Sequence, residues 1–362
     1  MAKKAYVGVN NVARKTKKIY VGVNGIARKV KKGYIGVNGK ARLFYQSALE
    51  LSKYGVGTAL SSPRRGHASA SVGNYALFAG GVNTNSDILD TGDIYDNFLS
   101  RSTLSLPYER RDLTGVSIGN YALFGGGVNS WGSDKNEGFA YNTTLVRSTL
   151  DVLSNGGGSG CATSVGNYAI FGGLNQSYYA DAYSSTLTKI RLVNLPEKAW
   201  YRAATAGNYA IFLTSYFNRC AAYDTSLTQS SPPQISGTIA NYFNMTSTGN
   251  YALVDHTYQN KVSAYNTSLT IVSAADISSS RNSKGEGTIK GFGLFAGGNG
   301  YSSVVDVYDS ALTRTNPAEL AQARSYTCAA ITNNYIIFGG GMGVSGSSTS
   351  NALNVVDIYQ VK

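Results

Sequence analysis

The sequence predicts an all-β fold, in which a small module of β-hairpins precedes a seven-bladed β-propeller. The chain of 362 residues contains 42 Gly and 27 Tyr, and only 14% of its residues are charged. This composition favours short strands joined by tight turns. A motif of the type Gly-Asn-Tyr-Ala-Leu/Ile-Phe recurs seven times at intervals of 41 to 47 residues, with three degenerate copies. Such a period accommodates one four-stranded blade.

The first 42 residues form a repeat of their own, with a period of 14 residues. The copies begin at Lys3, Lys17 and Lys31, and the second reads Lys-Lys-Ile-Tyr-Val-Gly-Val-Asn-Gly-Ile-Ala-Arg-Lys. Tyr-Val-Gly-Val alternates as a strand does, and Asn-Gly or Asn-Asn suits a two-residue turn, so each copy predicts a β-hairpin. Such a short segment, with few large apolar side chains, buries too little surface to fold alone. We expect residues 1–42 to be a docking or oligomerisation module.

The net charge of +12 resides entirely in this module. Residues 1–42 contain 12 basic and no acidic residues, whereas the other 20 basic residues balance all 20 acidic ones. The basic residues could form a solvated face, hold nucleic acid or an anionic wall polymer, or dock onto an acidic partner. Regular hairpins favour docking, because nucleic-acid tails are usually irregular and disordered. The residues expected to carry the docking are Lys17, Lys18, Tyr20, Arg28, Lys31, Lys32, Tyr34 and Arg42.

The two ends of the chain predict that the propeller closes into a ring. The last repeat stops after its third strand, near Tyr359, and lacks a fourth. At the front, Phe44-Tyr-Gln-Ser-Ala-Leu-Glu aligns with Val307-Tyr-Asp-Ser-Ala-Leu-Thr. We therefore expect residues 43–52 to supply the outer strand of the last blade, which hides two sheet edges. The propeller domain is expected to span residues 43–362.

Within each unit, two turn motifs separate the strands. Gly-Asn joins the first strand to the second, because both residues tolerate positive φ in a two-residue hairpin turn. A later Tyr-Asp/Asn-x-Ser/Thr-Leu-Thr/Ser element, as in Tyr223-Asp-Thr-Ser-Leu-Thr, joins the third strand to the fourth. The Asp or Asn side chain there can close a turn on its own backbone. Each unit is therefore expected to be a four-stranded antiparallel blade.

These motifs resemble those of kelch-repeat β-propellers over residues 43–362. A Gly-Gly doublet ends the second strand in five units, as at Gly80-Gly81, and a Tyr-Asp turn follows downstream. Two units lack the doublet, and Leu stands where the family usually has Trp. The 14-residue N-terminal repeats are similar to segments of tail and baseplate-associated proteins of phages and prophages of Gram-positive bacteria. This second resemblance implies docking to other virion proteins and a homo-oligomer, such as a trimer.

Residue types that would support catalysis are scarce. The kelch resemblance makes copper-dependent galactose oxidases a class to consider, and these need two His, two Tyr and a Cys for the copper and cofactor site. The two histidines of this chain, His67 and His256, fall in different blades. The three Cys residues have no metal-type spacing and are expected to be buried free thiols. The Asp-box pattern of sialidase propellers is absent, and the Gly-rich stretches lack the context of a phosphate loop. We therefore expect no enzymatic activity, no metal and no cofactor.

One rim of the propeller is the expected binding surface. The connections between first and second strands and between third and fourth strands are short and uniform, whereas the other two kinds vary in length and emerge on the opposite rim. Aromatic rings and amides in these variable loops suit a sugar or a protein hot spot. Alternatively, the rings only pack the loops against the blades. The candidate residues are Asn129, Trp131, Asn175, Tyr178, Tyr179, Tyr216, Phe217, Tyr258 and Tyr301.

Two functions are compatible with these features. In the first, the protein belongs to a phage or phage-like particle, docks through residues 1–42 and presents the variable rim to a bacterial surface glycan or protein. In the second, it is a cytoplasmic bacterial kelch adaptor whose basic N-terminus binds nucleic acid. The N-terminus has no apolar signal segment, and no stretch reaches transmembrane length. We expect synthesis in the host cytoplasm, location in the virion and no membrane insertion.

Overall fold

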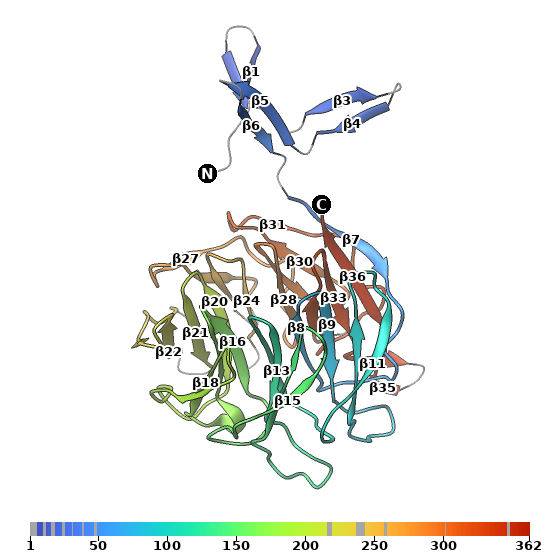
Figure 1. Ribbon diagram of the computed structural model, residues 1–362, viewed down its shortest axis with the longest axis vertical. Helices are drawn as coiled ribbons and strands as arrows, with labels where there is room; N and C mark the ends of the chain where they lie inside the picture. Colours follow the sequence, from blue (N-terminus) through green and yellow to red (C-terminus); the bar gives the residue numbers. More distant parts are fainter. Residues whose placement is uncertain are drawn as a thin grey trace. The chain divides into compact units, whose positions relative to one another are not determined.

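The computed structural model describes two compact units, Met1–Glu50 with Lys362, and Leu51–Val361 (Figure 1). The described residues are 6–9, 12–15, 19–23, 26–30, 32–37, 40–46, 49–215, 219–236, 243–256, 259–300, 302–345 and 348–362. The described chain is all-β apart from one 3-10 turn, Leu174–Gln176. No helix in this part of the chain has the length and apolar character needed to cross a membrane.

The larger unit is a seven-bladed β-propeller of four-stranded antiparallel blades, which confirms the predicted fold class. In six blades, the strands follow one another in chain order from the inner to the outer edge. Their bounds are β8 (Ala68–Val72), β9 (Tyr75–Ala79), β10 (Thr91–Tyr95) and β11 (Arg101–Ser105); β12 (Thr114–Ile118), β13 (Tyr121–Gly125), β14 (Gly138–Asn142) and β15 (Arg147–Leu150); β16 (Cys161–Val165), β17 (Tyr168–Gly172), β18 (Ala180–Ser184) and β19 (Lys189–Arg191); β20 (Tyr201–Ala206), β21 (Tyr209–Thr214), β22 (Cys220–Asp224) and β23 (Gln229–Ser230); β24 (Met245–Ser247), β25 (Ala252–Asp255), β26 (Val262–Tyr265) and β27 (Ile271–Ser273); β28 (Gly285–Ile289), β29 (Phe292–Ala296), β30 (Val305–Tyr308) and β31 (Arg314–Thr315).

The seventh blade takes its outer strand from the start of the propeller unit. It has the order β32 (Cys328–Ile331), β33 (Tyr335–Gly339), β36 (Val356–Val361) and β7 (Leu51–Val56), and a hairpin of β34 (Met342–Ser345) and β35 (Ser348–Ala352) extends from it. In Figure 1 the blue β7 lies beside the red β36, with which it pairs antiparallel. The N-terminal strand therefore closes the last blade, as predicted.

The bounds of this closing strand differ from the expected residues 43–52. Residues 40–46 form β6 and pair with β5 in the smaller unit, and the closing strand begins only at Leu51. The alignment explains the difference, because Phe44 and Tyr45 correspond to residues at the end of a third strand. In the seventh blade β36 already occupies the third position, so that only the fourth position is open.

The described strands of the smaller unit form three two-stranded antiparallel hairpins, one for each 14-residue repeat. Their strands are β1 (Tyr6–Val9) with β2 (Val12–Lys15), β3 (Tyr20–Val23) with β4 (Ile26–Lys29), and β5 (Lys32–Val37) with β6 (Lys40–Gln46). In each hairpin the strand Tyr-Val/Ile-Gly-Val pairs with the segment that contains Ala-Arg. This is the pairing expected from the alternating pattern on either side of the turn.

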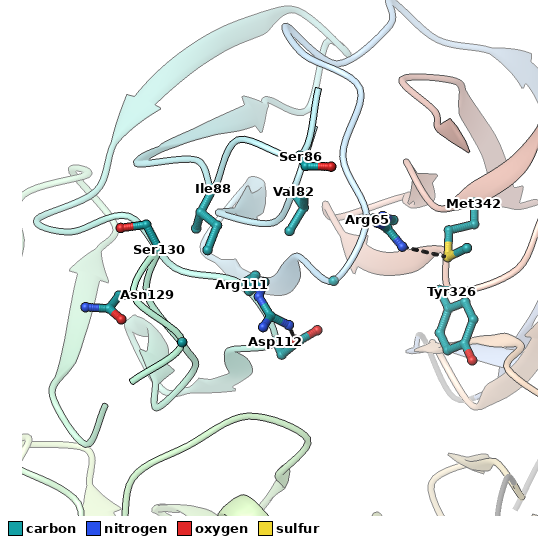
Figure 2. A pocket seen from close by; sticks show the side chains of 12 residues that line it. Arg65, Val82, Ser86, Ile88, Arg111, Asp112, Asn129, Ser130, Tyr326 and Met342 are labelled. Carbon is teal, nitrogen blue, oxygen red and sulfur yellow. Dashed lines mark hydrogen bonds and ion pairs between the residues drawn. The ribbon is translucent and has the colours of Figure 1, made fainter. Parts of the chain in front are cut away.

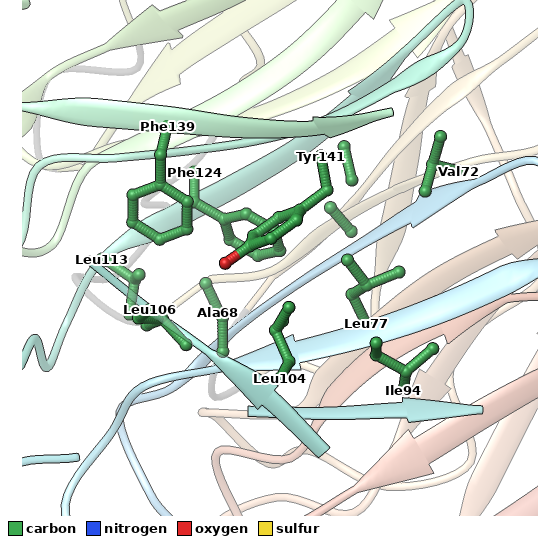
Figure 3. Close-up of a cluster of buried hydrophobic side chains, with 13 residues drawn as sticks. Ala68, Val72, Leu77, Ile94, Leu104, Leu106, Leu113, Phe124, Phe139 and Tyr141 are labelled. Carbon is green, nitrogen blue, oxygen red and sulfur yellow. The ribbon is translucent and has the colours of Figure 1, made fainter. Parts of the chain in front are cut away.

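The core lies between the blades, where the aromatic residues of one sheet pack on the preceding sheet. Figure 3 shows the junction of the first two blades, where Phe124 and Tyr141 of the second pack against Leu77 and Ile94 of the first. At the point of ring closure, Phe78 and Tyr95 of the first blade pack against the seventh. In most blades the Phe and Tyr rings meet edge to face, as in Phe338 and Tyr359 at 6.0 Å.

Each of these tyrosines also joins two blades through its hydroxyl. The Tyr265 hydroxyl, for example, donates a hydrogen bond at 2.8 Å to the carbonyl of Pro233. Pro233 lies in the connection between the fourth blade and the fifth, to which Tyr265 belongs. The equivalent bonds run from Tyr95 to Thr58, Tyr141 to Ser105, Tyr183 to Asp151, Tyr223 to Val193, Tyr308 to Ala275 and Tyr359 to Ala318. A buried ring thus packs on the previous sheet while its hydroxyl donates to a backbone carbonyl at the end of that sheet's outer strand or just beyond it.

The turn between the third and fourth strands adopts the predicted Asx geometry. The Asp224 carboxylate accepts hydrogen bonds from the backbone N–H groups of Ser226 and Thr228, both at 2.9 Å. Leu227 then takes a φ of 65°, a left-handed conformation that is unfavourable for Leu. Its side chain packs against the hydrophobic cluster of blades three and four, which offsets this cost. The same positive φ recurs at Leu99, Leu145, Leu187, Leu269 and Leu312.

Candidate functional site

The variable rim predicted from the loop pattern contains a pocket of 640 Å³. Figure 2 shows that its walls come from loops of the seventh, first and second blades. All of its lining residues lie in blade-to-blade or second-to-third-strand connections, the two classes expected to share a rim. They are Arg65, Gly66, Val82, Ser86, Ile88, Arg111, Asp112, Asn129, Ser130, Gly132, Tyr326 and Met342. The volume is within the range typical of small-molecule sites.

The pocket combines cationic, amide and aromatic groups. The Arg65 guanidinium approaches the Met342 sulfur at 3.8 Å and pairs with no carboxylate in the described part of the chain. Arg111 forms an ion pair with Asp112 at 2.5 Å. The Tyr326 side chain is 45% exposed. Guanidinium groups bind carboxylates and phosphates, and an aromatic face can stack on a flat or apolar ligand surface.

Two arginine pairs position these groups. Arg64 is fully buried and binds Asp93 at 2.9 Å, while its neighbour Arg65 lines the pocket. In the next blade the buried Arg110 binds Glu137 at 3.1 Å, while Arg111 lines the pocket. The first arginine of each pair therefore anchors the connection, and the second is presented to the pocket. The repeated Arg-Arg dipeptide before the first strand is the sequence signal that could have identified Arg65 and Arg111.

Among the residues predicted for the rim, Asn129 lines the pocket. Its side-chain oxygen accepts a hydrogen bond from the backbone N–H of Ser133 at 3.0 Å, which fixes the loop. Trp131 lies in the same loop and is 88% exposed. Tyr216, Phe217, Tyr258 and Tyr301 lie outside the described residues.

The candidates from the third blade, Asn175, Tyr178 and Tyr179, do not line the pocket and instead contact nearby side chains. The ring of Tyr179 has the Arg191 guanidinium 4.2 Å from its centroid, and Tyr178 has the Lys198 ammonium at 5.6 Å. The two tyrosine rings also meet edge to face at 4.6 Å. Asn175 donates a hydrogen bond to Asp134 of the neighbouring blade.

Five of the eight predicted docking residues lie in strands of the hairpins: Tyr20, Arg28, Lys32, Tyr34 and Arg42. Tyr20 and Tyr34 are 55% and 56% exposed, and Lys32 is also exposed. Arg28 lies in β4 and Arg42 in β6. Lys17, Lys18 and Lys31 lie outside the described residues.

The histidines and cysteines occupy structural positions in the propeller. His67 is buried, its Nε2 lies 3.1 Å from the Gly339 carbonyl, and burial lowers its pKa to about 3. His256 lies 2.9 Å from the Ser263 hydroxyl. Burial raises the pKa of all three cysteine thiols to about 12, and none forms a disulfide. The described residues contain no cluster of three or more potential metal ligands.

Comparisons with known proteins identify the fold. No family model matches the sequence, and no curated protein sequence matches it either. The chain is similar to 949 chains of solved structures, so the architecture is widespread and does not by itself single out a function. One of them, described as a streptogramin B lyase structure, has a TM-score of 0.58 and 13% identity, covering 87% of this chain and 98% of that chain.

This likeness corrects the expectation that the protein has no enzymatic activity. The similar propeller is named as a lyase, so a protein of this fold can be an enzyme. The expectation was based on the absence of motifs from two known enzyme families, and catalytic residues on a propeller need not follow either motif. At 13% identity the likeness shows the shared fold alone.

Proposed function

We propose that the protein is a receptor-binding structural component of a phage or phage-like particle, and that its variable rim binds a host-surface glycan or protein. The observation that carries the proposal is the 640 Å³ pocket, built from the variable loops of three blades. Rigid strands hold these loops in place, an arrangement that allows recognition residues to vary without loss of the fold.

The composition of the pocket favours a saccharide that carries a negative charge. Arg65 supplies a cation without a carboxylate partner in the described chain, and Asn129 and Ser130 supply amide and hydroxyl groups. Tyr326 supplies an exposed ring for the apolar face of a sugar. The hairpin module would attach the protein to acidic virion partners, since residues 1–42 contain 12 basic and no acidic residues.

The test is a pull-down of the full-length protein on intact bacterial cells and on isolated cell-wall glycans. We expect the double variant Arg65→Ala/Arg111→Ala to lose at least about tenfold in affinity, because two charge-assisted contacts to the ligand are removed. Lys261→Ala is the matched control. It removes an exposed cation from the same rim, outside the pocket lining, and should bind as the unmodified protein does.

Equal binding by the double variant and the control would overturn the assignment of recognition to this pocket. Binding lost in both variants would show instead that the whole rim acts through diffuse charge. The alternative function, a cytoplasmic adaptor with a nucleic-acid-binding N-terminus, is favoured by the charge of residues 1–42. It is separated from the first by a measurement of salt dependence, described in the Discussion.

A further inference from the structure

The first strands of the blades surround a central channel with a cavity of 370 Å³. Half-buried positions alternate with buried ones along these strands, as in β8 and β12, and the half-buried side chains face the channel. The channel is distinct from the rim pocket, although both are bordered by Gly66, Asp112 and Tyr326.

At two adjacent positions near the start of the first strands, three consecutive blades differ from the other four in residue type. The residue that pairs with the Phe or Val of the second strand is, in blade order, Ser69, Gly115, Ala162, Ala203, Met245, Glu286 and Ala329. The residue before it is Ala68, Thr114, Cys161, Arg202, Asn244, Gly285 and Cys328. Arg202 in β20, Asn244 directly before β24 and Glu286 in β28 thus place polar and charged groups in neighbouring blades, where the four other blades have small residues or Thr and Cys.

The two charged groups retain binding capacity on the channel side. One carboxylate oxygen of Glu286, Oε1, accepts hydrogen bonds from the Met245 backbone N–H at 3.2 Å and from the Asn244 amide. Its other oxygen, Oε2, has no hydrogen bond or ion pair within the described residues. Arg202 donates to the Tyr201 carbonyl at 3.1 Å and has no carboxylate within 4.0 Å in the same part of the chain.

The remaining charges along the channel are already paired. Lys284 binds the carboxylate of Asp255 and the Arg281 carbonyl, and Asp112 pairs with Arg111. His67 is neutral near physiological pH, because burial lowers its pKa to about 3. Arg202 and Glu286 therefore provide one positive and one negative charge, close enough to interact electrostatically but too far apart for an ion pair.

A hydroxyl in the same lining also lacks a partner. Ser283 is only 7% exposed, and its Oγ forms no hydrogen bond in the described structure. It belongs to the same channel lining as Glu286. A buried polar atom without a partner costs free energy, which a bound polar molecule would recover.

We propose that the channel binds a small zwitterion, an α-amino acid or a short peptide, with its carboxylate on Arg202 and its ammonium group on Glu286. A single molecule with both charges bridges the two side chains and leaves no net charge in the channel. A cavity of 370 Å³ accommodates a ligand of this size. A molecule with one charge would leave the opposite side chain unpaired in the channel.

Calorimetric titration of the full-length protein tests this proposal. The probes are glycine, L-alanine, L-glutamine, L-lysine and glycylglycine, with acetate and methylammonium as single-charge controls. We expect at least one zwitterion to bind at least about tenfold more tightly than either control ion. Arg202→Gln and Glu286→Gln should each weaken that binding about tenfold or more, whereas Lys261→Gln and the rim variant Arg65→Ala should leave it unchanged.

A second measurement on the unmodified protein covers the case in which a channel variant fails to fold. Enclosure in the channel raises the pKa of Glu286, although Arg202 and the Asn244 amide act in the opposite direction. A bound ammonium group would lower that pKa, which carboxyl carbon NMR can follow during titration with the probes. Absence of binding by every zwitterion, or equal binding of acetate, would overturn the proposal. Because the rim variant is a control here, failure of this proposal leaves the rim assignment intact.

Discussion

At the residue scale, the propeller depends on buried charges that hold the blade connections. Asp93, Asp306 and Asp357 occupy equivalent positions in three third strands, and each binds a buried arginine. The Asp306 pair is at 2.6 Å, and the carboxylate also accepts bonds from Ser278 and Asn316. Such a pair adds little net stability over apolar packing, but removal of one partner leaves a buried charge uncompensated.

Arg324→Leu is therefore expected to destabilise the protein by about 3 to 5 kcal/mol. Arg324 is fully buried and binds Asp357 at 2.8 Å, so its loss removes one of the two cations on that buried carboxylate and leaves Lys53, which is partly exposed to solvent, at 2.7 Å. Chemical denaturation measures the difference. The control is Lys261→Leu, which breaks an exposed pair with Asp276 and should cost about 1 kcal/mol or less. Similar losses in both variants would contradict the structural role of the buried pair.

The buried His67 makes stability depend on pH. The pKa of His67 is about 3 in the folded protein against 6.5 for the free side chain, so the unfolded chain binds a proton that the folded chain excludes. This contribution is fully present above pH 6.5 and is lost as the pH falls from 6.5 toward about 3. We expect the unfolding free energy to fall by up to about 1.4 kcal/mol per pH unit in that window. His67→Gln should flatten the slope in denaturation curves, and an unchanged slope would refute the assignment.

At the element scale, the fourth strand of the seventh blade closes the ring. β7 contributes hydrogen bonds to β36 and places Lys53 beside Asp357. Its backbone covers the edge of the last blade, which would otherwise be open to pairing with another chain. Leu51 and Val361 also pack against the cluster between the sixth and seventh blades.

A chain that begins at Gly57 should therefore lose cooperative unfolding or melt at a markedly lower temperature. A chain that begins at Leu51 retains β7 and should unfold with the cooperativity of the full-length protein. Calorimetry and size-exclusion chromatography compare the two, and the shorter one is expected to aggregate through its open edge. Equal melting temperatures would show that the ring is stable without this strand.

At the scale of the whole molecule, the net charge is distributed unevenly between the two units. The basic excess lies in residues 1–42, and the propeller unit contains equal numbers of basic and acidic residues. Long-range attraction to any anionic partner must therefore act through the hairpins. The propeller, by contrast, has a pocket at its rim and a cavity in its channel.

The full-length protein is expected to bind duplex DNA at about 50 mM salt and to release it by about 200 mM, because contacts to phosphate alone are salt-sensitive. The chain that begins at Leu51 should bind at neither concentration. Fluorescence anisotropy with labelled duplex measures both. Binding by the full-length protein that persists at about 200 mM salt would favour the nucleic-acid adaptor over docking to a virion partner.

The sequence by itself determined the number of blades, their strand order and the closure of the ring. These features repeat, and each copy of Gly-Asn-Tyr and of Tyr-Asp-x-Ser-Leu-Thr specifies the same local turns and the same buried faces. The variable rim could also be located, because antiparallel blades fix which connections share a side. Asn129 was identified in this way, and it lines the pocket.

Only the tertiary structure decided which side chains meet across blades. Arg65 and Tyr326 line one pocket although they are separated by most of the chain, because ring closure brings the first and seventh blades together. Arg202 and Glu286 lie about two repeats apart and share a channel because both are on first strands. Local patterns encode turns and burial within one blade, whereas a site between blades depends on how the closed ring sets their loops and inner strands against one another.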